Sequence, residues 1–117
     1  MSIVNLTARV VRVYSADRPD NVDDIDLGLL HVFDPQPDTA QLTPILLVTT
    51  SEDDVPIELV EYGHVENLPA RRDGVRLIVP LDVALTQPRR DDLLATYQDV
   101  ATSDGTVIGC RALAQPV

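Results

Sequence analysis

The chain has 117 residues, of which nineteen are acidic and nine basic, and its formal net charge is −10. This charge argues against binding nucleic acid or an anionic membrane through the bulk of the surface. With 44% hydrophobic residues, the chain is expected to fold as one domain over residues 1–117 rather than to be disordered.

Lysine is absent: all nine basic residues are arginine, and aspartate far outnumbers glutamate. A GC-rich genome disfavours lysine but does not by itself favour aspartate. Salt adaptation explains both biases, because a lysine stem exposes methylenes that concentrated salt makes costlier to hydrate. Arginine is retained as the basic residue because its planar guanidinium group still pairs with carboxylates in concentrated salt. In composition the chain resembles proteins of haloarchaea and of their viruses; a high-GC bacterial or phage source is the alternative.

The first third of the chain predicts two strands with a loop between them. Alternating apolar residues predict a strand at 3–14. The apolar positions change parity near Val10-Val11, which indicates either a bulge there or a strand buried on both faces. A second strand is predicted at 25–33, although Gly28 weakens it. Turn-forming residues predict the loop at 15–24.

The middle of the chain begins with its strongest break. Two prolines separated by one residue stiffen the backbone and predict a Pro-rich arm or long loop at 34–44. The continuous apolar run at 45–50 predicts a buried central strand. Residues 51–62 fit either a capped helix or an alternating strand, and Pro56 with the β-branched residues favours the strand.

The last third predicts a hairpin and a final strand. Asp73-Gly74 supplies the backbone angles of a tight turn, which predicts a hairpin between residues 64–72 and 75–81. The final strand is predicted at 106–114.

One helix is predicted at 88–101, where apolar residues follow helical spacing. The expected fold class is therefore mainly β, a β-sandwich or small barrel of six to seven short strands, with one short α-helix near residues 88–101.

Cys110, His31 and His64 are the candidate nucleophile and bases. Cys110 lies on the apolar face of the last predicted strand, where cysteine acts as a buried hydrophobe rather than as a thiolate. The two histidines lack the spacing of a zinc helix and have no third ligand that the sequence identifies. The sequence therefore predicts no catalytic residue and no cofactor.

Asp23, Asp24 and Asp26 form the densest aspartate cluster. Oxygen ligands suit calcium or magnesium, but the spacing does not fit a calcium-binding loop. The cluster is interpreted as a solvated surface, and no metal ligand is predicted. A cation site between subunits is the alternative, and an Asp-dependent divalent-metal enzyme would use the same residues.

Arg71, Arg72 and Arg76 are the candidate partner-docking residues. The first two come just before the predicted turn, so they would project together toward a carboxylate-rich neighbour and bind it bidentately. The alternative is that they balance nearby aspartates such as Asp73 and Asp91.

The expected function is that of a non-enzymatic structural or assembly subunit from a halophilic source, with protein partners in a homo-oligomer or larger assembly. A virion component of a haloarchaeal tailed virus, such as a capsid decoration or head–tail protein, fits a small β-rich domain with an arm. The alternative is a small ligand-binding or regulatory β-domain. Neither a signal peptide nor a transmembrane segment is predicted, so the expected location is the virion or the cytoplasm.

Overall fold

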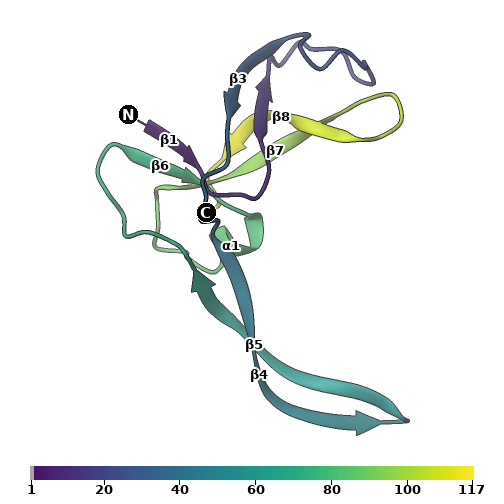
Figure 1. The fold of residues 1–117 in the computed structure, drawn as a ribbon, viewed down its shortest axis with the longest axis vertical. Helices are drawn as coiled ribbons and strands as arrows, with labels where there is room; N and C mark the ends of the chain where they lie inside the picture. Colours follow the sequence, from purple (N-terminus) through teal and green to yellow (C-terminus); the bar gives the residue numbers. More distant parts are fainter. Residues whose placement is uncertain (1) are drawn as a thin grey trace.

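The computed structural model describes residues 2–117, and the mainly β fold predicted from the sequence is confirmed (Figure 1). The described chain contains eight strands in two sheets and one short helix. In chain order the elements are β1 (Ser2–Asn5), β2 (Val11–Tyr14), β3 (Leu29–Phe33), β4 (Gln41–Glu52), β5 (Val55–Glu66), β6 (Val75–Ile78), α1 (Leu81–Leu85), β7 (Leu93–Ala101) and β8 (Val107–Ala114).

The larger sheet has six strands in the order β1-β6-β7-β8-β2-β3. β6 pairs in parallel with β1 and β7, while β7 pairs antiparallel with β8. β2 joins β8 in parallel and β3 antiparallel. Just after β3, Pro35 forms a parallel bridge with Asn5 of β1, so the sheet curls until its two outer strands nearly meet at one end.

Two aliphatic clusters bury both faces of the central strands. Leu77 and Leu93 belong to the cluster that joins α1 to the sheet, whereas Ile78 and Leu94 belong to the cluster around Cys110. Neighbouring residues of a strand point to opposite faces, so each cluster covers one face of β6 and β7. The core is aliphatic, as the four aromatic residues of the chain imply.

The helix predicted at 88–101 is wrong. Residues 93–101 form β7, which lies between β6 and β8. A strand buried on both faces carries a continuous apolar run, and Leu93, Leu94 and Ala95 are all buried. The helix of the described chain is α1, which starts after Pro80 and has five residues.

The strand predicted at 3–14 is two strands, β1 and β2, because the buried Asn5 side chain interrupts it. Its Nδ2 donates to the carbonyl oxygens of Arg9 at 2.7 Å and Phe33 at 2.9 Å, and its Oδ1 accepts from the Thr7 backbone N–H at 2.9 Å. These bonds hold residues 6–10 in a turn where a ladder was expected. The strand predicted at 25–33 likewise starts only at Leu29.

The Asp73-Gly74 turn exists, and Gly74 has a φ of 77°, but the hairpin predicted around it is wrong. β6, which follows the turn, pairs in parallel with its neighbours, and a tight turn cannot join parallel strands. The final strand predicted at 106–114 is confirmed as β8.

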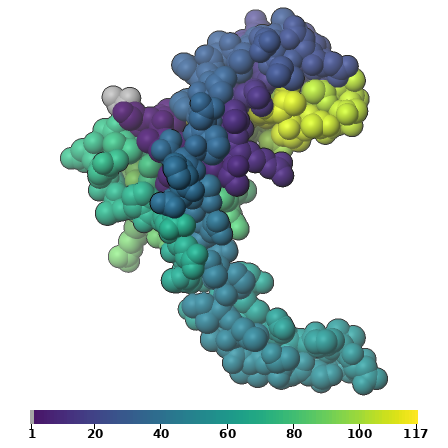
Figure 2. Space-filling model, viewed as in Figure 1, coloured from purple at the N-terminus to yellow at the C-terminus, as the bar shows by residue number. Residues whose placement is uncertain are grey.

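The buried central strand predicted at 45–50 is also wrong, because these residues are exposed in β4. β4 and β5 form a separate two-stranded sheet, here called the hairpin (residues 41–66). It projects from the body, which comprises all the other elements (Figures 1 and 2). Of the segment predicted as an arm at 34–44, residues 34–40 connect β3 to β4, and the remainder begins the hairpin.

Candidate functional site

The hairpin is fixed to the body only at its root. Leu42 and Val65 pack against the cluster that contains Leu77, whereas residues 44–52 of β4 are exposed without exception. Of the segment 51–62, which was expected to be a strand, residues 55–62 are confirmed as part of β5, whereas residues 51–52 end β4 and residues 53–54 form the turn. The turn between the strands places Asp53 and Asp54 at φ 51° and 61°, the left-handed region that aspartate tolerates in tight hairpins.

The outer half of the hairpin has one apolar and one polar face. Val48 lies opposite Leu59, and Thr50 lies opposite Ile57; residues opposite each other share a face of the sheet. Val55 shares this face by alternation. The other face carries the pairs Thr49–Glu58 and Ser51–Pro56. We call the first the apolar face: Val48, Thr50, Val55, Ile57 and Leu59.

No element among residues 2–117 covers the apolar face as a second layer. Val55 is 57% exposed, Ile57 43% and Leu59 60%. An isolated two-stranded hairpin is marginally stable in water and normally packs its apolar side against another element. A contiguous exposed patch of this kind is typical of an interaction surface.

The hairpin is also the most acidic part of the chain. It contains all four glutamates and two aspartates but no arginine, which gives a charge of −6. Two glutamates flank the apolar face at its two ends. Glu52 lies opposite Val55, and Glu61 follows Leu59 by two residues. All nine arginines lie in the body.

The hairpin gives the molecule more surface than a compact chain of its size. The radius of gyration is 17.3 Å, against about 13 Å for a compact domain of this length. The accessible surface is 7779 Å², whereas a folded monomer of this mass exposes about 6,300 Å². The excess is about 1,500 Å², which is of the size that protein interfaces bury.

The body carries a pocket of about 550 Å³, here called the Arg9 pocket. Apolar side chains of Val10, Leu81 and Val107 line it, and all three are at least one third exposed. Arg9 and Arg12 also line it and make no ion pair within residues 2–117. The pocket is therefore lined mainly by apolar side chains, with two arginines and one acid, Asp99, in its wall.

Two residues that were not singled out from the sequence shape this pocket. Asn5 holds the turn that carries Arg9, through the bonds described above. Gly109 lets β8 approach β2, because a Cβ there would meet the Arg12 carbonyl oxygen and lie 2.7 Å from a Tyr14 ring carbon. The Asn5-Leu6-Thr7 triplet was the available sequence signal for the turn, because asparagine side chains cap local backbone groups.

The predicted docking residues Arg71, Arg72 and Arg76 do lie together, around a hollow of about 270 Å³. Arg71 donates to Asp91 at 2.6 and 3.3 Å and to Asp73 at 2.9 Å. The hydrogen bonds that Arg71 donates to Asp91, and then the one to Asp73, raise the pKa of Arg71.

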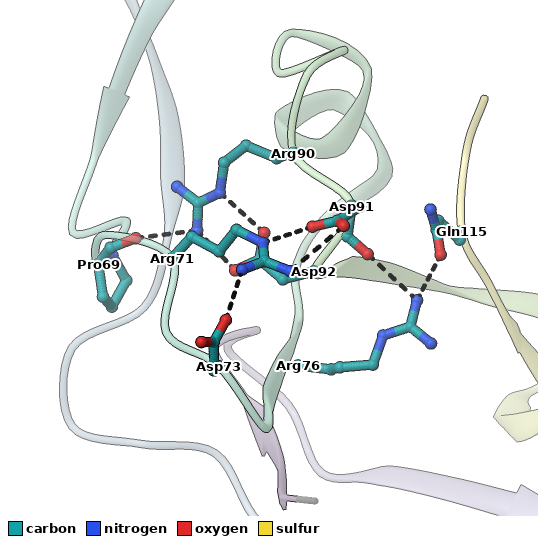
Figure 3. A network of polar contacts seen from close by, with 8 residues as sticks. All are labelled: Pro69, Arg71, Asp73, Arg76, Arg90, Asp91, Asp92 and Gln115. Atoms are coloured by element: carbon teal, nitrogen blue, oxygen red, sulfur yellow. Dashed lines mark hydrogen bonds and ion pairs between the residues drawn. The ribbon is translucent and has the colours of Figure 1, made fainter.

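Arg71 and Arg76 belong to a network of polar contacts (Figure 3). Arg76 donates to Gln115 at 2.6 Å, and Arg90 makes two 2.8 Å bonds to Asp92. These contacts match the alternative of local charge balance for Arg71, and the docking role of the three arginines stays a prediction.

Cys110, His31 and His64 are not brought together as a catalytic group. Cys110 is fully buried, and burial raises the pKa of its thiol. His31 stacks on Phe33 with ring centroids 5.9 Å apart. His64 Nε2 lies 3.8 Å from Glu66 in the hairpin.

The aspartate cluster makes hydrogen bonds to the β7–β8 loop and within its own loop. Asp23 accepts from the backbone N–H and the hydroxyl of Ser103, at 2.9 and 2.8 Å, and these bonds lower the pKa of Asp23. Asp24 accepts from the backbone N–H of Asp26 at 3.0 Å. Across residues 2–117, no three His, Cys, Asp or Glu side chains gather to hold a metal.

The described part of the chain also contains no helix with the length and hydrophobicity that crossing a membrane requires. Comparison with known proteins finds no matching family model, no matching curated protein and no matching solved structure.

Proposed function

We propose that this chain is a non-enzymatic structural subunit that assembles with protein partners through the apolar face of its hairpin. The observation that carries the proposal is the exposure of Val55, Ile57 and Leu59 on a ribbon with no covering layer. Burying these side chains on a partner supplies about 25 cal/mol per Å² of apolar surface removed from water.

The assembly is proposed to be a virion of a haloarchaeal tailed virus, with this chain as a capsid decoration or head–tail protein. The lack of lysine and the excess of aspartate support a saline setting. A small body with a long projecting hairpin suits a subunit that reaches onto a neighbour.

Size-exclusion chromatography with light scattering in molar sodium chloride tests the proposal. The wild type should elute as a trimer or larger ring, and Ile57→Thr with Leu59→Thr should shift the mass to the monomer. Threonine keeps the strand propensity of both positions while removing apolar surface. Glu58→Gln, on the polar face, is the matched control and should leave the mass unchanged. A wild type that remains monomeric at high concentration would contradict assembly through copies of this chain.

The salt adaptation has its own test, the melting temperature measured from low to molar salt. Screening shortens the Debye length to about 3 Å at 1 M, so the self-repulsion of a chain with a charge of −10 should largely vanish. The melting temperature should therefore rise steeply with salt. An unchanged value would favour the genome-composition explanation for the missing lysines.

A second candidate function is the binding of a small molecule in the Arg9 pocket. Its volume of about 550 Å³ falls in the range of ligand sites, and the two arginines would select an anion. A monomeric wild type that binds small anions, with binding lost in Arg9→Gln, would favour this function over assembly.

A further inference from the structure

We infer that the partner of the hairpin is a second copy of this chain, which receives the apolar face of the hairpin in its Arg9 pocket. This inference rests on the proposed function and deepens it, because it names both the occupant of the hairpin and the surface that accepts it.

The charges of the two surfaces are complementary. Glu52 and Glu61 flank the apolar face of the hairpin, and residues 41–66 contain no arginine. The Arg9 pocket offers Arg9 and Arg12 against one acid, Asp99. Carboxylates on the hairpin and guanidinium groups on the pocket can therefore form charge-assisted hydrogen bonds at the rim of an apolar contact.

Other surfaces of the body suit the hairpin less well. The hollow around Arg71 has cations, but Val75 is its one aliphatic lining residue, so it offers little to an apolar ribbon. The edge strand β3 exposes Leu30 and Val32, but the loop before it carries Asp23, Asp24 and Asp26, which would repel the acidic hairpin.

The areas also fit a contact in which each copy uses two surfaces. A standard interface buries about 800 Å² on each partner. The hairpin gives each copy the excess surface of about 1,500 Å² derived above, which is more than the roughly 800 Å² that its side of one contact needs, and the pocket is a second, separate surface.

Such a contact is head-to-tail, because the hairpin and the pocket are different surfaces of the chain. A head-to-tail contact closes into a ring when the rotation between neighbours allows it and otherwise continues as a filament. Two copies of charge −10 repel each other at long range, so the assembly should need salt, whereas ion pairs in direct contact persist when the Debye length is about 3 Å.

Complementation between two disabled variants tests the inference. Ile57→Thr with Leu59→Thr disables the hairpin, and Arg9→Glu with Arg12→Glu disables the pocket. Each variant alone should be monomeric in molar salt. An equimolar mixture should give a species of twice the chain mass and nothing larger, because the one intact hairpin and the one intact pocket meet once per pair. Light scattering measures that mass directly.

A charge exchange provides the second measurement. Glu52→Arg with Glu61→Arg should weaken assembly at least tenfold. Mixing this variant with the Arg9→Glu, Arg12→Glu variant should restore assembly beyond two chains, because both contacts between unlike copies then pair opposite charges. Glu58→Arg makes the same type of change on the polar face and should have little effect. If Arg9→Glu with Arg12→Glu fails to fold, as judged by circular dichroism, the Arg9→Gln, Arg12→Gln variant takes its place.

The outcomes separate this inference from the proposed function. An assembly that needs the apolar face but is unaffected by the Arg9 and Arg12 changes overturns the inference and leaves the proposed function standing. A mixture that remains monomeric, from variants whose parent assembles, also overturns the inference. A wild type that does not self-associate overturns the second copy as the partner.

Discussion

The body and the hairpin differ in how their side chains are buried and paired. In the body, buried polar groups find partners within the chain: Arg18, although only 4% exposed, donates to the carbonyl oxygens of Leu27 and Asp24 at 2.9 and 2.8 Å. In the hairpin, apolar side chains such as Leu59 stay in water. The body has a buried core of its own, with its exposed apolar side chains concentrated at the Arg9 pocket and β3, whereas the outer half of the hairpin has no buried side chain.

We therefore expect the body to determine the stability of the monomer and the outer hairpin to determine its assembly. Changes in the body should affect the free energy of unfolding of the monomer, because its groups contact one another closely. Changes at the outer hairpin should affect association and leave that free energy almost unchanged. Four measurements test this division.

The largest expected effect is that of Gly109→Ala in the body. The new Cβ would overlap the Arg12 carbonyl oxygen and a Tyr14 ring carbon 2.7 Å away, and both belong to packed groups that cannot easily move. We expect a loss of about 3 kcal/mol in the free energy of unfolding, because overpacking forces strands apart. Urea denaturation measures it.

The matched control is Gly63→Ala in the hairpin. A Cβ there meets only the end of the Glu61 side chain, at 3.8 Å, so the change should stay within about 0.5 kcal/mol. Equal losses for the two variants would break the division between body and hairpin.

Arg18→Lys should have the next largest effect. The Arg18 fork donates to four backbone carbonyl groups of its loop and lies 4.7 Å from the centre of the Tyr14 ring. A lysine ammonium cannot reproduce this planar set of donors, so we expect a loss of about 2 kcal/mol. Arg89→Lys is the control at an exposed position and should be neutral. A neutral Arg18→Lys would contradict a structural requirement for arginine in this loop.

The fold could be predicted from the sequence only where it depends on neighbouring residues. The mainly β class and the strand nature of residues 55–62 followed from alternation, which depends only on neighbouring residues. The split between β1 and β2 did not, because it depends on Asn5 bonding to Phe33, far away in the chain. The helix error had a similar cause: Leu93 and Leu94 face two different clusters, and their spacing alone does not distinguish a doubly buried strand from a helix.

The candidate site was predictable only in part. The run at 45–50 is as apolar as a central strand, and no neighbouring residue indicates that these side chains are exposed. The better signal was the repeated Asp at 53–54 between two strand-like segments of twelve residues each, a two-residue connection that favours a hairpin. The Arg9 pocket forms from four separate segments, so its arginines could not be distinguished from Arg71 and Arg72 by sequence.

Acid should weaken the body through the Arg90–Asp92 pair. The hydrogen bonds from Arg90 lower the pKa of Asp92 below its usual value of 3.8, and the Asp92 side chain is only 4% exposed. A carboxyl whose pKa is lower in the folded state stabilises the protein above its unfolded pKa, and this contribution is lost as the pH falls through the folded value. The free energy of unfolding should therefore drop below about pH 4.

Asp92→Asn should flatten that acid dependence while reducing stability at neutral pH, because Arg90 loses its charged partner. Asp54→Asn, in the exposed hairpin turn, changes the net charge equally and is the control. Chemical denaturation at several pH values compares the three proteins. An acid dependence that is identical in Asp92→Asn and the wild type would assign it to other carboxylates.

The smallest expected effect on stability is that of Ile57→Thr with Leu59→Thr, measured on the monomer at a concentration too low for assembly. Both side chains are about half exposed or more in the monomer, so truncating them leaves no cavity, and the free energy of unfolding should change by less than about 0.5 kcal/mol. Leu93→Ala, at a buried position of the body, should instead lose about 3 kcal/mol. The same hairpin variant is expected to abolish assembly. An unchanged free energy of unfolding together with lost assembly would show that Ile57 and Leu59 contribute to association and not to folding. A loss comparable to that of Leu93→Ala would mean that the hairpin folds back and covers this face within one chain.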